Sequence, residues 1–268
     1  MTPADPRELL TAARAAAAAG ADVAMAYWRR ADALDVKEKK GPGDLVSQAD
    51  TEAEAAVRAV LGDLRPDDAV LGEEAGAHEG TSGVRWVVDP IDGTTNYLYG
   101  RADWAVSVAA TDASGRVLAG VVAEPAHGRT TEAWAGGGTW SAGRRVPALA
   151  QTDLSRALVE TNLGRSGQKA AAGRLLEALV PRVRDVRRGG SAACALAQVA
   201  TGRTDACWVP GLSPWDCAAG ILLVREAGGL VGDLTGIVAD TVPASGDVLA
   251  ASPQLWEQLR GLIRPAVE

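Results

Sequence analysis

Histidine and cysteine are scarce in this chain of 268 residues. It has two histidines, at 78 and 127, and three cysteines, at 194, 207 and 217, without the spacing of a metal site. Zinc centres and serine triads need histidines or clustered cysteines, and this chain has few residues with which to form either kind of site. An odd number of unclustered cysteines indicates reduced thiols, which predicts a cytoplasmic protein. Any catalytic chemistry must therefore depend on carboxylates.

An excess of positive charge and a long apolar run are also missing. The formal net charge is −7, which argues against nucleic acid as a general partner. The alanine-rich stretch at 12–19 contains Arg14 and is too weakly apolar to predict a membrane span. The first residues have neither the basic region nor the apolar core of a signal peptide. We therefore expect no nucleic acid and no membrane among the partners.

Residues 1–150 are predicted to form an α+β half. Helices are expected over 6–30, where Pro6 opens the helix, and over 51–64, after a strand-and-loop region at 35–50. Hydrophobic patterning predicts strands at 69–74, 104–111, 116–124, 129–134 and 138–140, a buried strand that begins at Trp86, and a polar loop at 77–84. This half should therefore be two helices on a mostly antiparallel sheet.

Residues 151–268 are predicted to form an α/β half. Strands are expected at 158–163, 183–187, 206–209 and 230–232, and helices at 168–180, 192–201 and 215–227 and from Pro253 onwards. Strands that alternate with helices are typical of α/β architecture. Because no low-complexity linker separates the two halves, we expect them to pack closely together.

The stretch at 86–97 carries the strongest chemical signal. It begins as a buried strand and then places two carboxylates, Asp89 and Asp92, three residues apart. Pro90 has no N–H for a sheet ladder and is expected to end the strand. Oxygen ligands suit hard cations such as Mg²⁺, which commonly share their ligands with a substrate phosphate. A common Asp-Pro turn is the alternative for this short string taken alone.

The residues that follow suit an anion site. Gly93 leaves room for another group to approach the backbone. Thr94, Thr95 and Asn96 are typical of a helix start, where unpaired N–H groups attract anions. The segment therefore predicts a strand that delivers two acids to a phosphate-binding helix end.

Asp50 has two interpretations. It precedes the predicted helix, so it is either the N-cap of that helix or an acid that faces a metal site and deprotonates water. Thr51 and Glu54 have the spacing of a capping box. Lys39 lies in a lysine-rich run that is typical of a solvated surface.

Three further positions have a structural and a functional interpretation. Glu73 ends a predicted strand, where acids often face solvent. Asp216 lies in the first turn of a helix, which the helix dipole alone would favour. The glycine-rich turn before Ser191 and Ala192 feeds another helix and is a weak candidate for anion binding.

Four separated strings resemble the inositol monophosphatase superfamily, whose members are Mg²⁺-dependent and lithium-sensitive phosphomonoesterases. The strongest is Asp89-Pro-Ile-Asp-Gly-Thr-Thr-Asn-Tyr. The others lie at 44–50, 72–74 and 215–220, and all four occur in the family's order across nearly the whole chain. The resemblance implies a layered α/β/α/β/α fold, a homodimer, and a site between the halves that hydrolyses a small phosphorylated metabolite.

The resemblance also implies roles for individual residues. The metal ligands for two or three Mg²⁺ ions would be Glu73, Asp89, Asp92, Asp216 and the carbonyl of Ile91. The catalytic group would be Thr94 and Asp50, which orient and deprotonate water, together with Glu73. The substrate would be bound by Asp92, Gly93, Thr94, Thr95, Arg165, Ser191, Ala192 and Asp216, with Lys39 nearby.

The substrate is less narrowly predicted than the reaction. Inositol-preferring members carry an acid where this chain has Val209, and often a serine where it has Arg165. A sugar or polyol phosphate is the leading expectation, and histidinol phosphate, fructose 1,6-bisphosphate and 3′-phosphonucleotides are the alternatives. A protein-interaction role is the non-enzymatic alternative, because some relatives bind transcription machinery.

Overall fold

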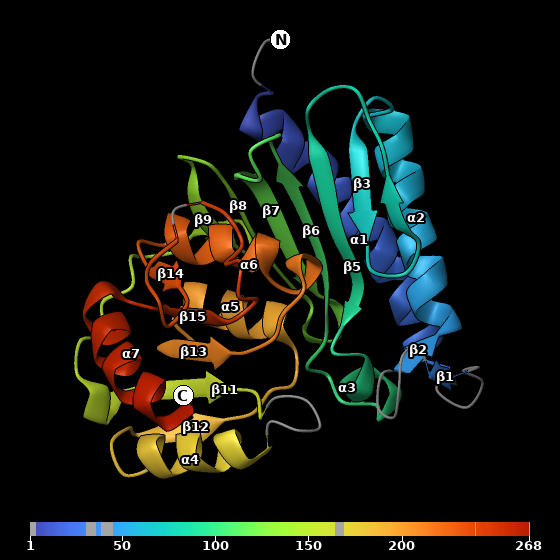
Figure 1. Cartoon of the computed structure of the whole chain (residues 1–268). Helices are drawn as coiled ribbons and strands as arrows, with labels where there is room; N and C mark the ends of the chain where they lie inside the picture. Colours follow the sequence, from blue (N-terminus) through green and yellow to red (C-terminus); the bar gives the residue numbers. More distant parts are fainter. Residues whose placement is uncertain (1–3, 31–35, 39–44, 164–168, 239, 268) are drawn as a thin grey trace.

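Helices and sheets alternate in five layers in the computed structural model, which describes residues 4–30, 36–38, 45–163, 169–238 and 240–267. From one side to the other, the order is helices, a large sheet, helices, a smaller sheet and helices (Figure 1). The predicted α/β/α/β/α arrangement is thereby confirmed.

The large sheet has eight strands in the order β10-β9-β8-β7-β6-β5-β3-β4. Their bounds are β3 Ala69–Gly72, β4 Gly76–His78, β5 Arg85–Asp92, β6 Ala105–Thr111, β7 Val117–Glu124, β8 Arg129–Trp134, β9 Gly138–Ser141 and β10 Arg144–Arg145. Every pairing is antiparallel except that of β3 with β5. The mostly antiparallel sheet was predicted, but β4 includes residues 77 and 78 of the segment that was expected to be a loop.

Helices α1 (Pro6–Trp28) and α2 (Gln48–Leu64) cover one face of this sheet (Figure 1). A short antiparallel pair, β1 (Val36–Glu38) and β2 (Leu45–Ser47), precedes α2. The buried side of α1 is mainly alanine, which lets the helix lie close to the sheet and to α2. Among the described helices, α1 alone is long and apolar enough to span a membrane by length and composition, and half of its apolar window is buried in the fold.

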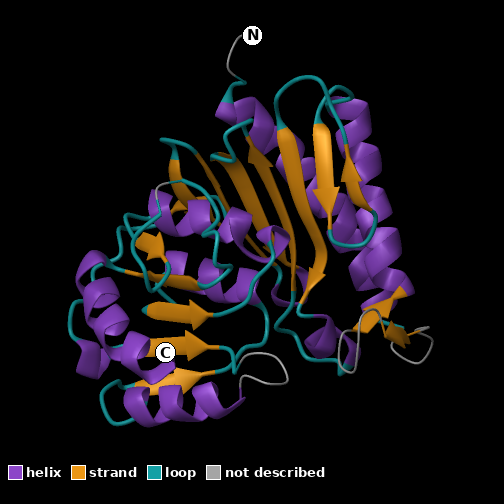
Figure 2. Ribbon diagram, viewed as in Figure 1, coloured by secondary structure: helices purple, strands orange, loops and turns teal. Residues whose placement is uncertain are grey.

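The smaller sheet has the order β12-β11-β13-β15-β14 (Figure 2). Its strands are β11 Leu158–Thr161, β12 Asp185–Arg187, β13 Ala206–Val209, β14 Leu230–Gly232 and β15 Val248–Ala251. The pairings of β11 with β12 and β13 are parallel, and those of β15 are antiparallel. Helices α4 (Lys169–Leu179) and α7 (Pro253–Val267) cover its outer face. Strand β15 was not predicted, because four small and apolar residues have no period that distinguishes a strand from a helix.

Helices α5 (Ala192–Ala200) and α6 (Pro214–Glu226) fill the layer between the two sheets. One apolar cluster joins these helices to side chains of β5, β6 and β7 on one side and of β13 and β15 on the other. The close approach depends on glycine at two places. A side chain at Gly120 would press on Ala219 of α6, and one at Gly220 would overlap Leu196 of α5.

Replacing Gly220 should destabilise this middle layer. A methyl group at Gly220 would overlap the buried side chain of Leu196, so Gly220→Ala should lower the free energy of unfolding by about 1–3 kcal/mol. Gly173 in α4 has no atom near its missing side chain, and Gly173→Ala should raise stability by about 0.5–1 kcal/mol. Urea unfolding of both variants measures the difference, and equal effects would contradict the packing described here.

Candidate metal centre

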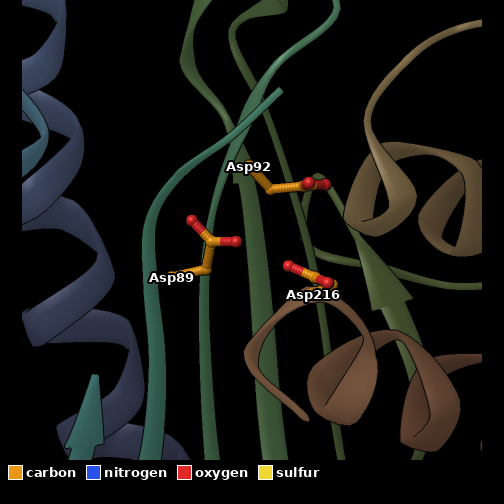
Figure 3. Close-up of side chains that lie close together, drawn as sticks. All are labelled: Asp89, Asp92 and Asp216. Atoms are coloured by element: carbon orange, nitrogen blue, oxygen red, sulfur yellow. The ribbon is translucent and has the colours of Figure 1, made fainter. Parts of the chain in front are cut away.

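The end of β5 holds the first two carboxylates. In a regular strand, residues three apart point to opposite faces of the sheet. The register against β6 shifts between Asp89 and Asp92, which indicates a β-bulge. The extra residue returns Asp92 to the side of Asp89 (Figure 3). Pro90 thus lies inside the strand at a bulge, where a missing N–H is tolerated, and the prediction that it ends the strand is wrong.

Asp216 reaches the same place from α6. Ser213 is the N-cap of this helix, so Asp216 occupies its third position, and its Oδ2 accepts the N–H of Ser213 at 2.7 Å. The positive end of the helix dipole favours an acid there. Asp89, Asp92 and Asp216 offer ligand oxygens that all lie within 4.8 Å of one another (Figure 3). Asp216 therefore caps α6 and at the same time belongs to the acidic cluster.

Glu73 is brought to the cluster by the parallel pairing of β3 with β5. Gly72 lies opposite Val88 in this pairing, so the next residue of each strand, Glu73 and Asp89, emerges at the same edge of the sheet. The N–H of Glu73 continues the ladder by donating to the carbonyl of Val88 at 3.2 Å. The register thus sets the acid of one strand end beside that of the other.

Asp50 approaches from α2 and is not the N-cap of that helix. The helix begins at Gln48 with Ser47 as its N-cap, which makes Asp50 the third helical residue. Its Oδ2 accepts the N–H and the hydroxyl of Ser47 at 2.9 and 2.6 Å. The capping box is formed by Ser47 and Asp50, so the expectation that Thr51 and Glu54 form it is wrong.

Thr94 connects Asp50 to the end of β5. Its hydroxyl lies 3.4 Å from Oδ1 of Asp50 and 3.2 Å from the carbonyl oxygen of Ile91. Gly93 caps the short helix α3 (Thr94–Leu98) with a φ of 96°, which disfavours other residues. A side chain at Gly93 would also crowd Ser191, so the turn into α3 requires glycine.

The N-terminus of α5 holds Asp92 in place. Oδ2 of Asp92 accepts the hydroxyl of Ser191 at 2.5 Å and the N–H of Ala193 at 2.6 Å. Ser191 is fully buried, and its oxygen also accepts the N–H of Cys194 as the helix N-cap. These donors direct Asp92 and favour its ionised form.

The turn that leads into α5 is itself fixed from two sides. The carbonyl oxygen of Gly189 accepts a hydrogen bond from Nδ2 of Asn96 at 2.7 Å. The N–H of Gly189 donates to the buried carboxyl group of Glu160 at 3.0 Å. Asn96 also donates to the carbonyl of Asp103 at 2.6 Å. Because Asn96 belongs to α3 and Glu160 to β11, this one residue connects the two sides of the site.

Burial and mutual repulsion disfavour negative charge in the cluster. Burial raises the pKa of Asp89 well above its usual range, and the charges of Glu73, Asp92, Asp216 and Asp50 raise it further. Burial and then Asp216 raise the pKa of Asp92 to about 8, against the opposing effect of Ser191 and Ala193. Such a group of acids ionises fully only when cations compensate its charge.

The donor set fits a hard divalent cation. It consists of carboxylate oxygens from β5 and α6, with the carbonyl of Ile91 close by and no histidine or cysteine ligand among the described residues of the cluster. Oxygen-only sets favour Mg²⁺, Mn²⁺ or Ca²⁺ over zinc or copper. The raised pKa of Asp92 agrees with a site that is completed by positive charge.

Most of the predicted site residues are found around this cluster. Those that the structure places at or next to it are Asp50, Glu73, Asp89, Ile91, Asp92, Gly93, Thr94, Thr95, Ser191, Ala192 and Asp216. Arg165 and Lys39 lie outside the described residues. The individual roles of all these residues remain predictions.

Sequence reasoning assigned Glu54 only to a capping box, missed Glu160, and did not foresee the role of Asn96 in holding the turn. Glu54 lies within the buried stripe of α2 beside Ala53 and Val57, and an acid at such a position signals a structural partner. Glu160 interrupts the apolar pattern of a buried strand in the same way. Arg58, four residues on in the same helix, is a local partner of Glu54, but the backbone N–H groups that Glu54 and Glu160 accept lie in distant loops that no local pattern identifies.

Comparisons with known proteins agree with this site. A model of the inositol monophosphatase family matches residues 5–268. An inositol-1-monophosphatase of Mesorhizobium japonicum is 44% identical over 200 residues, covering 74% of this chain and 75% of that protein. The Nus factor SuhB of Pseudomonas aeruginosa is 38% identical over 261 residues, covering 95% and 94%. The crystal structure of the extragenic suppressor protein suhB from Bartonella henselae has a TM-score of 0.91 at 33% identity, covering 96% and 98%.

Without divalent metal, the protein should become less stable as the pH rises. The pKa of Asp92 is about 8 in the folded chain and that of Asp89 is also raised, while both return to ordinary values on unfolding. Unfolding then releases protons, so the contribution of Asp92 to the free energy of unfolding is greatest below about pH 4 and is lost as the pH rises to about 8, and the contribution of Asp89 falls in the same direction. Urea unfolding in chelator between about pH 5 and pH 8 measures this slope.

The matched variant for this prediction is Asp216→Asn. Asp216 is the charge that raises the pKa of Asp92 most, so its removal should flatten the slope. A wild-type protein whose stability does not change over this range would contradict the electrostatic description.

Proposed function

This chain belongs to the inositol monophosphatase family, which makes it a phosphoric monoester hydrolase, and we propose that it hydrolyses a small sugar or polyol phosphate with Mg²⁺. The observation that carries the proposal is the convergence of Asp89, Asp92 and Asp216 within 4.8 Å. Three carboxylates so close together, with a hydroxyl–carboxylate pair beside them, suit a reaction between water and a phosphate ester.

The proposed metal ligands are Glu73, Asp89, Asp92, Asp216 and the carbonyl of Ile91, which together would hold two or three ions. When bound, Mg²⁺ supplies charge that neutralises the phosphate and lowers the pKa of water. The protein's own contribution is to hold the carboxylates close together although they repel one another. The bulge in β5, the donors from α5 and the cap of α6 perform this task.

Thr94 and Asp50 are the proposed route for the proton of the attacking water. The threonine hydroxyl can accept a hydrogen bond from water while it donates its own proton toward Oδ1 of Asp50, 3.4 Å away. The hydrogen bonds from Ser47 hold the other oxygen of Asp50. Asp50 is therefore oriented as a base, and no covalent nucleophile from the protein is needed.

The phosphate is proposed to lie at the start of α3 and beside α5. Backbone N–H groups of Gly93 and Thr95 would donate to its oxygens, and the missing side chain of Gly93 allows a close approach. Ser191 and Ala192 would border the substrate from the α5 side. A homodimer in the cytoplasm, with neither nucleic acid nor membrane as a partner, completes the proposal.

The alcohol part of the substrate is proposed to be bound without the acid that inositol-preferring relatives use. Val209 has 1% of its surface exposed and belongs to the core between the sheets. It cannot accept a hydrogen bond from a sugar hydroxyl. Inositol phosphate and bisphosphorylated sugars or nucleotides are therefore all reasonable test substrates, and histidinol phosphate is a further one.

A second candidate function follows from one comparison. A relative that aligns over 95% of this chain is named a Nus factor, so a protein-binding role beside the enzymatic one is a reasonable alternative. Binding alone would not require so many acids in one place. A pull-down with a variant such as Asp216→Asn would separate the two roles, because binding alone should survive the loss of this acid.

Activity should require a divalent metal. Phosphate release from a panel of phosphomonoesters should disappear in excess chelator and return with Mg²⁺, because repelling carboxylates cannot bind a phosphate dianion unaided. Asp216→Asn should weaken the response to Mg²⁺. Asp112→Asn, in the hairpin turn before β7, should leave it unchanged. Full turnover in chelator would contradict the metal-dependent mechanism.

Loss of the threonine hydroxyl should affect the rate more than substrate binding. Thr94→Ala or Asp50→Asn should lower kcat by about 10²-fold or more, as expected when a positioned base is lost. Thr130→Ala removes an exposed hydroxyl on β8 and serves as the control. Steady-state kinetics together with circular dichroism tests this, and a folded Thr94→Ala enzyme with normal kcat would refute the assignment.

A further inference from the structure

Glu54 is a buried acid that the proposed reaction does not use. It lies on α2, four residues after Asp50, and 1% of its surface is exposed. Residues four apart on a helix lie on the same side, so Glu54 points the same way as Asp50, one turn further along. A buried carboxylate needs partners that compensate its desolvation, and those partners reveal what it does.

The partners of Glu54 are backbone groups of the loop after β3. Oε2 accepts the N–H of Glu74 at 2.7 Å, and Oε1 accepts the N–H of Ala75 at 3.1 Å. Both N–H groups follow Glu73 directly in the chain. The carboxylate therefore holds the backbone on the far side of Glu73.

Arg58, one turn further along α2, adds two hydrogen bonds to this contact between α2 and the loop. Its Nε donates to Oε1 of Glu54 at 2.7 Å, and its Nη2 donates to the carbonyl of Gly76 at 2.5 Å. Three consecutive residues, 74–76, are thus bound from one helix. The arginine also neutralises the buried charge of Glu54, which keeps this acid available as an acceptor.

Gly72 shows that the fit is tight on the near side of Glu73 as well. A side chain at Gly72 would overlap the carboxylate of Glu54, so glycine is required there for steric reasons. The N–H of Glu73 is bonded to Val88. Glu73 is consequently held on both sides, by the packed residue before it and by the bonded residues after it.

We propose that Glu54 is a positioning residue that sets Glu73 against Asp89 and ties it to the helical turn carrying Asp50. The inference rests on the proposed function, in which Glu73 binds metal and Asp50 accepts the proton of water. One rigid helix would then fix the distance between a metal ligand and the base. Residues that orient metal ligands commonly change metal affinity by about 10–100-fold when they are mutated.

The test is the binding of Mg²⁺ alone to chelator-treated protein, measured by titration calorimetry, together with kinetics. Glu54→Gln keeps the size of the side chain but replaces one of the two accepting oxygens by an NH₂ donor, which cannot accept the backbone N–H that faces it. Its Kd for Mg²⁺ should rise by about 10–100-fold. The metal concentration needed for half-maximal activity should rise in parallel, with kcat largely restored at saturating Mg²⁺.

Asp68→Asn is the matched control. Asp68 is also a buried acid with an arginine partner, Arg65, and it accepts the indole N–H of Trp86 at the opposite ends of β3 and β5. Its loss should lower the melting temperature and leave the Kd for Mg²⁺ unchanged. Gly72→Ala displaces the Glu54 carboxylate while every charge remains, and it should reproduce the weaker metal binding if Glu54→Gln does not fold.

The outcomes separate the two proposals. Wild-type affinity in both the Glu54 and the Gly72 variant, or an equal loss in Asp68→Asn, would overturn the positioning role and leave the phosphatase proposal in place. A wild-type protein that binds no Mg²⁺ would overturn both.

Discussion

Repulsion among buried carboxylates is the constraint on which this structure depends. Asp89, Asp92 and Asp216 lie within 4.8 Å of one another, with Glu73 and Asp50 near enough to raise the pKa of Asp89. Left to themselves, such groups would separate or take up protons. The fold prevents their separation, so bound protons or a bound cation are the remaining means of relief. The affinity expected for a hard cation therefore depends on how rigidly the acids are confined.

Helix N-termini provide much of that confinement. Asp50 and Asp216 each occupy the third position of a helix and accept the N–H of its N-cap residue, while Asp92 accepts an N–H at the start of α5. Each helix presents the positive end of its dipole to an acid. The same contacts fix the direction of each side chain. Capping, usually regarded as an alternative to a functional role, is here the means by which three acids are positioned.

Packing determines whether these helices can reach the sheet at all. Asp216 lies far along the chain from Asp89, and α6 must approach β7 closely for the two to meet. Gly120 on β7 and Gly220 on α6 allow that approach because they lack side chains. Core packing between the sheets is therefore coupled to the positions of the acids at their edge. A substitution that moves α6 away from β7 should also move Asp216 relative to Asp89.

The site could be predicted from sequence where local chemistry determines it. The pair Asp89 and Asp92 and the turn at Gly93 belong to one segment, whose spacing and residue types indicated an oxygen-ligand site, with an Asp-Pro turn as the alternative until the family resemblance was considered. The bulge at Pro90 was not foreseen, because a proline in a strand predicts an end unless the register of the neighbouring strand is known. The N-cap of α2 was misplaced by a few residues, which exchanged one capping box for another.

The residues whose roles were not predicted act between elements. Glu54 and Glu160 each interrupt an apolar pattern, and each accepts backbone N–H groups from a loop far away in the chain. A sequence pattern can mark such an acid as unusual, but only the fold identifies the loop that it holds. The acidic cluster depends on contacts around β5 and the three helix ends, and Gly189 links the turn before α5 to β11 through Glu160. The smaller sheet therefore helps to place the turn that leads into α5, and the N-terminus of α5 in turn holds Asp92. The positions of the acids depend on both sheets, although the smaller sheet contributes none of them.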